Sequence, residues 1–495
     1  MKTSKNDQGA HSAEPFLKLK FCGGVGTTTG ANFLLTGLRQ DHASHAEGAD
    51  SHFRILVDCG LEQGEGHDSG RESSDFNRSS FPYDPATIDI LLVTHAHTDH
   101  IGRIPKLVAE GFAGTIFSTE ETKKITEIMF EDALKLMLQE SAREQKPPMY
   151  TAEHVSRAMS LWKTIEYHQN HELHPGYTVY LKDAGHVLGS TIYELTVEDR
   201  RSAQNGGTGY KRKIAFTGDL GNTPSPLLRD TEYVTDADYL LMESVYGDRN
   251  HEDRTQRTAK LHDAIVDNTN RRGVMVMPVF ALEKTQELLY EIHELIKAHN
   301  LPHITVYLDA PMAIKLTELY SRMNKNFNPH ALAESRHENI LSFPGLRIST
   351  SAEDSKAIGH MPSPKIIMAG SGMSNGGRVL HHELQFLGDP NNTILFTGYQ
   401  AVGTIGRLIR DGASQVMVHG EKLRVRARML AIDGYSSHKD SEHLVEFVSH
   451  TADTVRKVFV CMGETKSALF LVQRLRDYLG VNAVHPEEGD EVVLD

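Results

Sequence analysis

One stretch, "IDILLVTHAHTDHIGR" at residues 88–103, constrains the fold more than any other part of the chain. Its short apolar run predicts a buried strand, and the apolar spacing from 101 to 111 predicts a helix directly after it. Three histidines and an aspartate stand between the two elements: His95, His97, Asp99 and His100. In α/β folds, ligands collect at the carboxyl ends of strands. The stretch therefore predicts an α/β fold with a ligand site at this turn.

The chemistry of these side chains suits a metal ion. Imidazole nitrogens and carboxylate oxygens are ligands for zinc, with iron or manganese as substitutes. A loop of helix-capping residues is the alternative, but four such side chains at this spacing rarely serve capping alone. A two-metal centre needs ligands from other loops, and two candidates stand at strand ends: His186 in "DAGHVLGS" and Asp219 in "IAFTGDLGN". Asp58, after "RILV", has the same setting and is expected to orient the metals or their water from behind.

The pattern of apolar residues changes along the chain. Up to about residue 60, short apolar runs alternate with glycine turns, as in antiparallel strands. From about 273, strand-like runs alternate with helix-like runs, which is the pattern of a parallel sheet covered by helices. A chain of 495 residues is long for one core. We therefore expect at least two compact units, or one domain inserted in another.

Composition limits where the chain works and what it binds. No apolar run approaches the roughly 18 residues that a membrane helix needs. Residues 1–15 contain lysines but no apolar segment, which predicts a disordered tail rather than a signal peptide. The three cysteines are far apart, which disfavours disulfides and predicts a cytoplasmic protein. The formal net charge of -14 disfavours non-specific polyanion binding, so a nucleic acid would need a local basic groove or bound metal ions.

Several motifs together resemble those of one family, the metallo-β-lactamase-fold nucleases of the β-CASP group. "THAHTDHIGR" is similar to the HxHxDH motif of this fold, and "VDCG", "GHVLGS" and "FTGDLG" are similar to its other metal motifs. Further blocks resemble β-CASP landmarks in the family's order: "LLMESVYGDRNH", "MPVFALEKTQELLY", "LDAPMA", "GSGMSNGGRVLHH", "GYQAVGTIGR" and "DGYSSHKD". The resemblance covers about residue 17 to the end. It implies an α/β fold, a metallo-β-lactamase αββα sandwich formed by 16–242 and 432–495, with a parallel-sheet β-CASP domain inserted at 243–431.

The resemblance also implies roles for single residues. The implied ligands of a first zinc ion are His95, His97, His186 and Asp219. The implied ligands of a second zinc ion are Asp99, His100 and the bridging Asp219. Glu243 would orient His438, which would assist the leaving oxygen, and with Asp99 and Asp58 these residues form the expected catalytic set. Two close metal ions can activate water and hold a phosphodiester oxygen, which makes RNA the expected substrate.

The glycine-rich stretch "AGSGMSNGGRVLHH" is the expected contact to the RNA backbone. It follows an apolar strand and opens a helix, so its amides could form an anion-binding nest, although an ordinary tight turn is the alternative. The expected substrate-binding residues are Ser371, Gly372, Arg378, Gln400 and Arg407. Basic residues also gather in "LRVRARM" and "GRLIR", as a positive groove or as a solvated strand face.

The chain departs from the family pattern in "VFVCMGE", where Met462 stands in the place of a histidine that completes the second metal site. A thioether is a weak ligand for zinc, so we expect a weaker or differently completed second site. His419, in "VHGE", precedes His438 and is interpreted as a strand residue. Cys461 would point to the opposite face of its strand. His485, in "AVHPEEG", is a substitute that does not rank above a loop histidine.

Three hypotheses follow for the function. The preferred one is a zinc-dependent ribonuclease that hydrolyses single-stranded RNA in a cleft between the two domains, in RNA processing or decay. The second is a catalytically weak or inactive β-CASP RNA-binding or scaffold subunit, which Met462 favours and the intact remaining ligands disfavour. The third is a small-molecule metallo-hydrolase, which the insertion and His438 disfavour. The sequence leaves internal and terminal cutting open, and it allows a homodimer.

Overall fold

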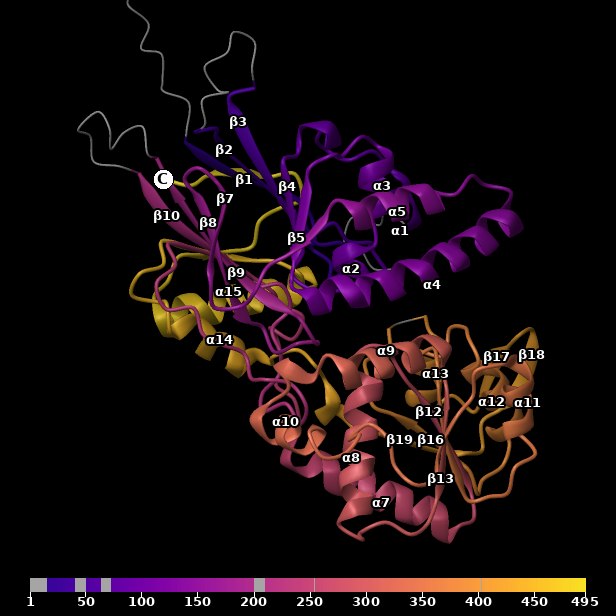
Figure 1. Ribbon diagram of the computed structural model, residues 1–495. Coiled ribbons are helices and arrows are strands. Elements are labelled where there is room, and N and C mark those ends of the chain that lie inside the picture. The colour runs from indigo at the N-terminus through magenta and orange to yellow at the C-terminus, as the bar shows by residue number, and fades with distance from the viewer. Residues whose placement is uncertain (1–15, 41–49, 64–72, 200–209, 253, 402) are drawn as a thin grey trace, which may run out of the picture.

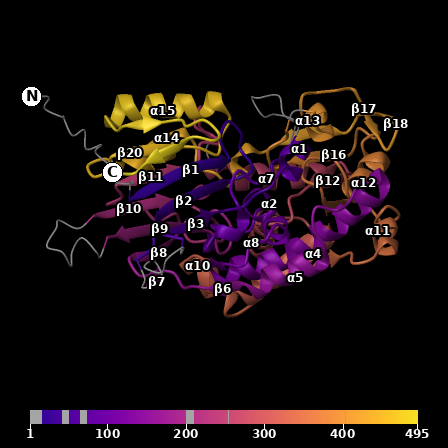
Figure 2. The same ribbon diagram turned by 90° about the horizontal axis from the view of Figure 1, so that it is seen from above.

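The computed structural model describes residues 16–40, 50–63, 73–199, 210–252, 254–401 and 403–495. The expected disordered tail, 1–15, lies outside them. Two seven-stranded sheets pack face to face, and a third sheet with its own helices lies beside them (Figure 1). The same division is visible from above, where the yellow C-terminal helices lie on the sandwich rather than on the third sheet (Figure 2).

The first sheet has the order β22-β1-β2-β3-β4-β5-β6. It is antiparallel from β22 to β3 and parallel from β3 to β6. Its strands are β1 (Leu17–Gly23), β2 (Asn32–Leu38), β3 (His52–Val57), β4 (Ile90–Leu92), β5 (Thr115–Ser118), β6 (Trp162–Thr164) and β22 (Glu491–Val493). β4 is buried on both faces, as its apolar sequence predicts.

The second sheet has the order β21-β20-β11-β10-β9-β8-β7. Its strands are β7 (Asn170–His174), β8 (Tyr177–Asp183), β9 (Thr191–Glu198), β10 (Lys211–Phe216), β11 (Tyr239–Met242), β20 (Lys457–Val460) and β21 (Ala483–Val484). Alternate residues of the two sheets, among them Leu19, Phe33, Tyr193 and Leu195, form one hydrophobic core between them. Apolar burial of this kind is the main force that holds two sheets together.

Helices cover both outer faces of this sandwich. Among the helices that share a hydrophobic cluster with the first sheet are α2 (Thr98–Ile101), α3 (Ile104–Ala109), α4 (Glu120–Glu144) and α5 (Ala152–Ser160). Short helices α1 (Ser73–Arg78) and η2 (Pro85–Thr87) lie in the connections around them. On the second sheet the helices are α14 (Ser441–Ser449) and α15 (Thr465–Leu479). The layers are therefore αββα, and the expected α/β class is confirmed.

The third sheet is parallel throughout and has the order β14-β13-β15-β12-β16-β19. Its strands are β12 (Val274–Pro278), β13 (Thr305–Asp309), β14 (Leu346–Ile348), β15 (Lys365–Ala369), β16 (Thr393–Phe396) and β19 (Arg428–Ala431). Two hydrophobic clusters cover its two faces. The helices of this part are η3 (Arg254–Gln256), α7 (Arg257–Asn270), α8 (Lys284–Lys297), α9 (Pro311–Arg322), η4 (Asn324–Asn326), α10 (Pro329–Ser335), α11 (Ala352–Ile358), α12 (Val379–Phe386) and α13 (Ile405–Arg410).

A hairpin of β17 (Gln415–Val418) and β18 (Glu421–Arg424) stands apart from the large sheets. His419 lies in the turn of this hairpin with φ 50°, so the expectation that it is a strand residue was wrong. The turn needs left-handed backbone at this point, and Gly420 follows it with φ 81°.

The chain leaves the sandwich after β11 and returns to it through η5 (Asp433–Tyr435), after β19. Hydrogen bonds join the two parts close to the "GHVLGS" loop. The backbone N–H of Leu188 donates to the Tyr320 hydroxyl (3.2 Å), which donates to Glu283 (2.6 Å). Asn326 donates to Glu121 on α4 (3.0 Å). These contacts fix the third sheet against the face of the sandwich that carries the candidate site. Within the described part of the chain, every helix is too short or too polar to cross a bilayer.

Candidate metal centre and active-site cleft

The histidine-rich turn lies at the carboxyl end of β4. β4 ends at Leu92, and α2 begins at Thr98 with His97 as its N-cap. Only glycine fits at position 60, which packs against this turn: a Cβ on Gly60 would lie 1.5 Å from the carbonyl oxygen of Asp99. Asp99 occupies the first turn of α2, where the helix dipole favours a negative charge. The turn thus presents its imidazoles and carboxylate at one edge of the sheet.

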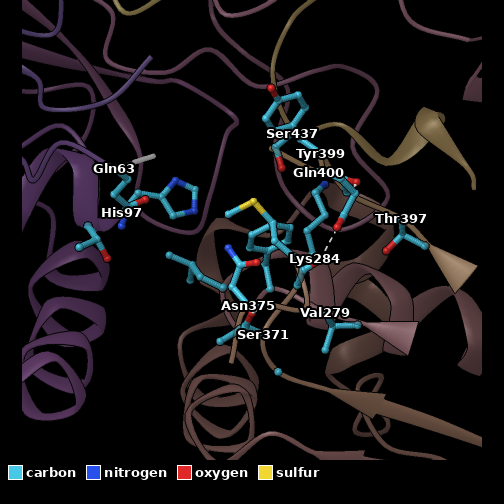
Figure 3. Close-up of a pocket in the computed structure, with 18 of the residues that line it drawn as sticks. Gln63, His97, Val279, Lys284, Ser371, Asn375, Thr397, Tyr399, Gln400 and Ser437 are labelled. Atoms are coloured by element: carbon cyan, nitrogen blue, oxygen red, sulfur yellow. Dashed lines mark hydrogen bonds between the residues drawn. The ribbon is translucent and has the colours of Figure 1, made fainter. Parts of the chain in front are cut away.

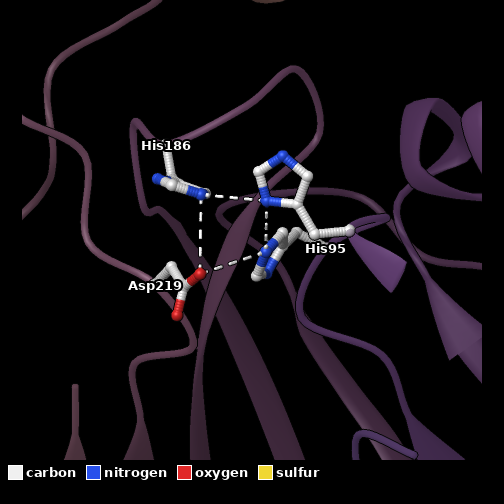
Figure 4. A group of neighbouring side chains, drawn as sticks. His95, His186 and Asp219 are labelled. Carbon is white, nitrogen blue, oxygen red and sulfur yellow. Dashed lines mark hydrogen bonds and ion pairs between the residues drawn. The ribbon is translucent and has the colours of Figure 1, made fainter. Parts of the chain in front are cut away.

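The first cluster brings together four side chains from three loops (Figure 4). The Nδ1 atom of His97 lies 3.1 Å from Nε2 of His95 and 3.1 Å from Nε2 of His186. The Oδ2 atom of Asp219 lies 3.4 Å from Nε2 of His95 and 3.5 Å from Nε2 of His186. A tetrahedral zinc ion with bonds of about 2.0–2.1 Å would hold its ligand atoms about 3.4 Å apart. The four side chains therefore fit one zinc ion.

The electrostatics of this cluster favour the form of histidine that binds metals. Burial lowers the pKa of His95, and it lowers the pKa of His97 and His186 well below the ordinary value. Neutral imidazole is the ligand form, so these residues need not release a proton at neutral pH. The pKa of Asp219 lies well below its usual range because the charges and hydrogen bonds of His100 and His95 outweigh its burial. Asp219 is therefore an ionised carboxylate that could bind a metal ion.

A second cluster consists of Asp99, His100 and Asp219. Nε2 of His100 lies 3.4 Å from Oδ1 of Asp219 and 3.9 Å from Oδ2 of Asp99. Asp219 thus offers one oxygen to each cluster, in the bridging position that the resemblance implies. Met462 is 1% exposed and belongs to the hydrophobic core between the two sheets. Nδ1 of His485 donates to the carbonyl oxygen of Val460 (2.8 Å).

Asp58 lies behind the second cluster. Its carboxylate accepts hydrogen bonds from the backbone N–H and the hydroxyl of Thr94, both at 2.8 Å, and contacts Nδ1 of His100 at 2.7 Å. It is 1% exposed and is not among the residues that line the cleft. Asp58 therefore positions His100 and leaves its Nε2 for a metal, rather than touching a substrate. The structure supports the orienting role expected for Asp58, whereas its membership of the expected catalytic set finds no support in a side chain this far from the cleft surface.

His438 and Glu243 form a pair beside the first cluster. Nδ1 of His438 lies 3.0 Å from Oε2 of Glu243, and the ring centroids of His438 and His186 are 4.6 Å apart. Glu243 is fully buried and also accepts a hydrogen bond from the backbone N–H of Leu220. Burial opposes protonation of His438, but the Glu243 carboxylate overcomes it and raises the pKa of His438 to about 9. The Glu243 carboxylate therefore favours the protonated form of His438 at neutral pH.

A cleft of about 1500 Å³ opens between the sandwich and the third sheet. Its lining includes His97, Asp99, His186 and His438, together with the glycine-rich loop on the opposite wall (Figure 3). All of the expected substrate-binding residues line it: Ser371, Gly372, Arg378, Gln400 and Arg407. The basic residues Arg424, Arg426 and Arg428 do not line it. The cleft thus joins the two clusters to the third sheet.

Several of these wall residues already bind protein partners, so their side chains are not simply free to bind phosphate. Gln400 is 1% exposed, and its amide donates to the carbonyl oxygens of Gly372 (2.8 Å) and Gly398 (3.2 Å), so it braces the loop. Arg378 donates to Asp309 (2.7 Å), and Arg407 donates to Asp411 (2.8 Å).

The loop also satisfies much of its own backbone. The N–H groups of Ser371 and Ser374 donate to loop carbonyls, and that of Asn375 donates to the Ser371 hydroxyl. The expected anion nest is therefore partly filled by the loop itself.

Sequence reasoning missed three residues of this cleft. Nε2 of His251 donates to the carbonyl oxygen of His438 (2.9 Å) and so holds the backbone of the loop that carries His438. Phe280 and Tyr399 present aromatic rings to the cleft. All three lie inside the quoted motifs, but no spacing or charge pattern distinguishes them from core and loop residues.

Comparison with known proteins matches three domain families to the chain. The Metallo-beta-lactamase superfamily domain matches residues 49–202, the Beta-Casp domain 285–409, and the Zn-dependent metallo-hydrolase RNA specificity domain 422–486. Ribonuclease TTHA0252 of Thermus thermophilus is 34% identical over 396 residues, which are 80% of this chain and 85% of that protein.

Transcription termination factor FttA is also similar. The proteins of Methanosarcina mazei and Methanothermobacter thermautotrophicus are 29% and 28% identical over 84% and 85% of this chain. The chain spans only 64% and 65% of the length of these two relatives. With the three domain matches and a ribonuclease relative covered over most of its length, the chain belongs to the β-CASP ribonuclease family of metallo-β-lactamase-fold, metal-dependent hydrolases.

Proposed function

We propose that the protein is a zinc-dependent ribonuclease that hydrolyses single-stranded RNA in RNA processing or decay. The observation that carries the proposal is the position of the two clusters, which share Asp219 and open into the cleft beside the Glu243–His438 pair. The three cysteines are free and buried, and we place the activity in the cytoplasm, where thiols persist.

The first cluster offers more ligand side chains to a metal ion than the second cluster does. His95, His97, His186 and Asp219 would hold the first ion through four protein atoms, whereas the second cluster offers Asp99, His100 and the shared Asp219. Bound zinc would supply positive charge to a phosphodiester oxygen and acidify a water molecule. Because Met462 packs in the core between the sheets, we expect the second site to be weaker than the first.

His438 would act as the proton donor of the reaction. Its Nδ1 is held by Glu243, so Nε2 is the nitrogen left to give a proton to the leaving oxygen. The raised pKa keeps that proton in place at neutral pH. Glu243 is buried and hydrogen-bonded on both sides, which fixes the ring without contact to the substrate. His251 holds the backbone of the same loop.

A catalytically weak RNA-binding subunit is the second candidate, and the incomplete second cluster is the observation that favours it. The two candidates differ in a direct experiment with 5′-labelled single-stranded RNA and zinc-loaded protein. A ribonuclease yields fragments that disappear in His97→Ala and on chelation, and their ladder separates internal from terminal cutting. His330→Ala is the matched control, because His330 is exposed on α10 and its side chain is 71% accessible. Bound but uncut RNA in the wild-type protein would leave only the second candidate.

A further inference from the structure

Two aromatic rings of the cleft take no part in the hydrophobic core. Phe280 is half-buried and Tyr399 is 47% exposed, and both line the cleft. Neither belongs to any of the hydrophobic clusters found among the described residues. In the same part of the chain, neither stacks on another aromatic ring, whereas exposed Tyr478 on α15 lies under Arg474. Large apolar surfaces left open inside a cleft mark a ligand contact.

The backbone fixes the ring of Phe280. A Cβ on Gly372 would lie 2.6 Å from its Cδ2, and a Cβ on Gly398 would lie 2.7 Å from its Cε2. The ring therefore packs directly against two glycine backbones, one after β15 and one after β16. Tyr399 follows Gly398 immediately. The ring of Phe280 is thus held at the wall by the backbone, and the more exposed Tyr399 is the next residue after one of the glycines that it packs against.

The arginines of this wall are paired with carboxylates, so an RNA ligand would gain from a contact that does not depend on charge. Arg378, Arg407 and Arg410 all line the cleft. Their carboxylate partners are Asp309, Asp411 and Asp433, at 2.7, 2.8 and 2.8 Å. The attraction of these guanidinium groups for phosphate is partly offset, and the chain as a whole carries -14. Stacking of bases on aromatic rings does not depend on that charge, and every base can take part in it.

We propose that Phe280 and Tyr399 form a nucleobase subsite of the cleft. Its ligand is an unpaired base of the RNA strand that crosses the metal centre, and it takes any of the four bases because stacking does not read hydrogen-bonding edges. In Figure 3, Tyr399 and His97 lie on different walls of the pocket, so a strand that reaches the metal ligands can place a neighbouring base at this subsite. The inference rests on the proposed ribonuclease function and adds the base contact to it.

The test is an abasic scan of single-stranded RNA. Binding is measured by fluorescence anisotropy in a His438→Ala background, so that the RNA stays intact. We expect Tyr399→Ala to weaken binding roughly 5- to 150-fold and Tyr399→Phe to bind like the parent. Removal of the base at one position of the RNA should weaken its binding to the parent by a similar factor. The same abasic RNA should bind Tyr399→Ala as tightly as the intact RNA does. Phe280→Leu, which keeps apolar volume against the two glycines, should show the same loss of base dependence at this or the adjoining position.

Tyr478→Ala is the matched control, because it removes a tyrosine that is 68% exposed and lies outside the cleft. The subsite is overturned if Tyr399→Ala binds like the Tyr478→Ala control, or if abasic positions weaken both proteins equally while the wild-type protein still cuts RNA. Failure of the wild-type protein both to bind and to cut RNA overturns the proposed function together with the subsite.

Discussion

The hydrogen bonds of Tyr320 should couple the stability of the two halves of the molecule. The side chain is fully buried on α9, donates to Glu283 (2.6 Å) and accepts from the backbone N–H of Leu188 (3.2 Å). Tyr320→Phe keeps the ring but removes both bonds. A buried polar group that loses its partner costs about 1–3 kcal/mol, and Glu283 and the Leu188 N–H both lose one, so the substitution should lower the free energy of unfolding by about 2–6 kcal/mol.

Tyr290→Phe is the matched control. Tyr290 is also buried in the third-sheet part and donates to Glu334 at 2.9 Å. Glu334 keeps a second partner, Lys297 at 2.7 Å, and its side chain is partly accessible to water. The control should therefore cost about 1 kcal/mol or less.

Urea denaturation followed by tryptophan fluorescence measures the coupling. Trp162 is the sole tryptophan of the chain. It is 3% exposed in β6 and donates to Ser118 (2.8 Å), so its emission reports on the sandwich rather than on the domain that carries Tyr320. The reasoning predicts that Tyr320→Phe shifts the Trp162 transition more than Tyr290→Phe does. A Trp162 transition that is the same in both variants would refute the coupling.

Three further predictions concern the site. After dialysis against metal-free buffer, the wild-type chain should retain about one zinc ion, and a measured content near two would contradict the weak second site. Glu243→Gln should lower the pKa of His438 from about 9, so the alkaline loss of RNA cleavage should begin at lower pH; an unchanged pH–rate profile would contradict the pairing. Burial raises the pKa of Glu383 to about 7, above the ordinary value of 4.5, so its ionisation opposes folding. The free energy of unfolding, measured by urea titration, should fall by about 3 kcal/mol between pH 4.5 and 7 in the wild type. This decrease should be absent in Glu383→Gln.

The sequence predicted the side chains that the structure brings together in the two clusters, because they are local or stand at strand ends. His95, His97 and Asp99 share one turn, and His186 and Asp219 follow buried strands that meet at the same edge. The alternation after residue 273 predicted the parallel sheet for a similar reason, since short apolar strands and amphipathic helices have distinct periods.

Contacts between distant segments could not be predicted in this way. Glu243 and His438 lie 195 positions apart, and they meet only because the fold brings the end of β11 next to the loop that carries His438. Gln400 was expected at the RNA, but its burial under the glycine loop depends on packing that no spacing reveals. Phe280 and Tyr399 are indistinguishable in the sequence from core aromatics.

The single-turnover rate of RNA cleavage by His438→Ala, compared with wild type at equal zinc content, tests the central claim most directly. If His438 donates the proton in a metal-dependent ribonuclease, the rate should fall by about 10²–10⁴-fold, while zinc content and RNA affinity stay close to those of wild type. A His438→Ala rate equal to that of wild type would contradict the account.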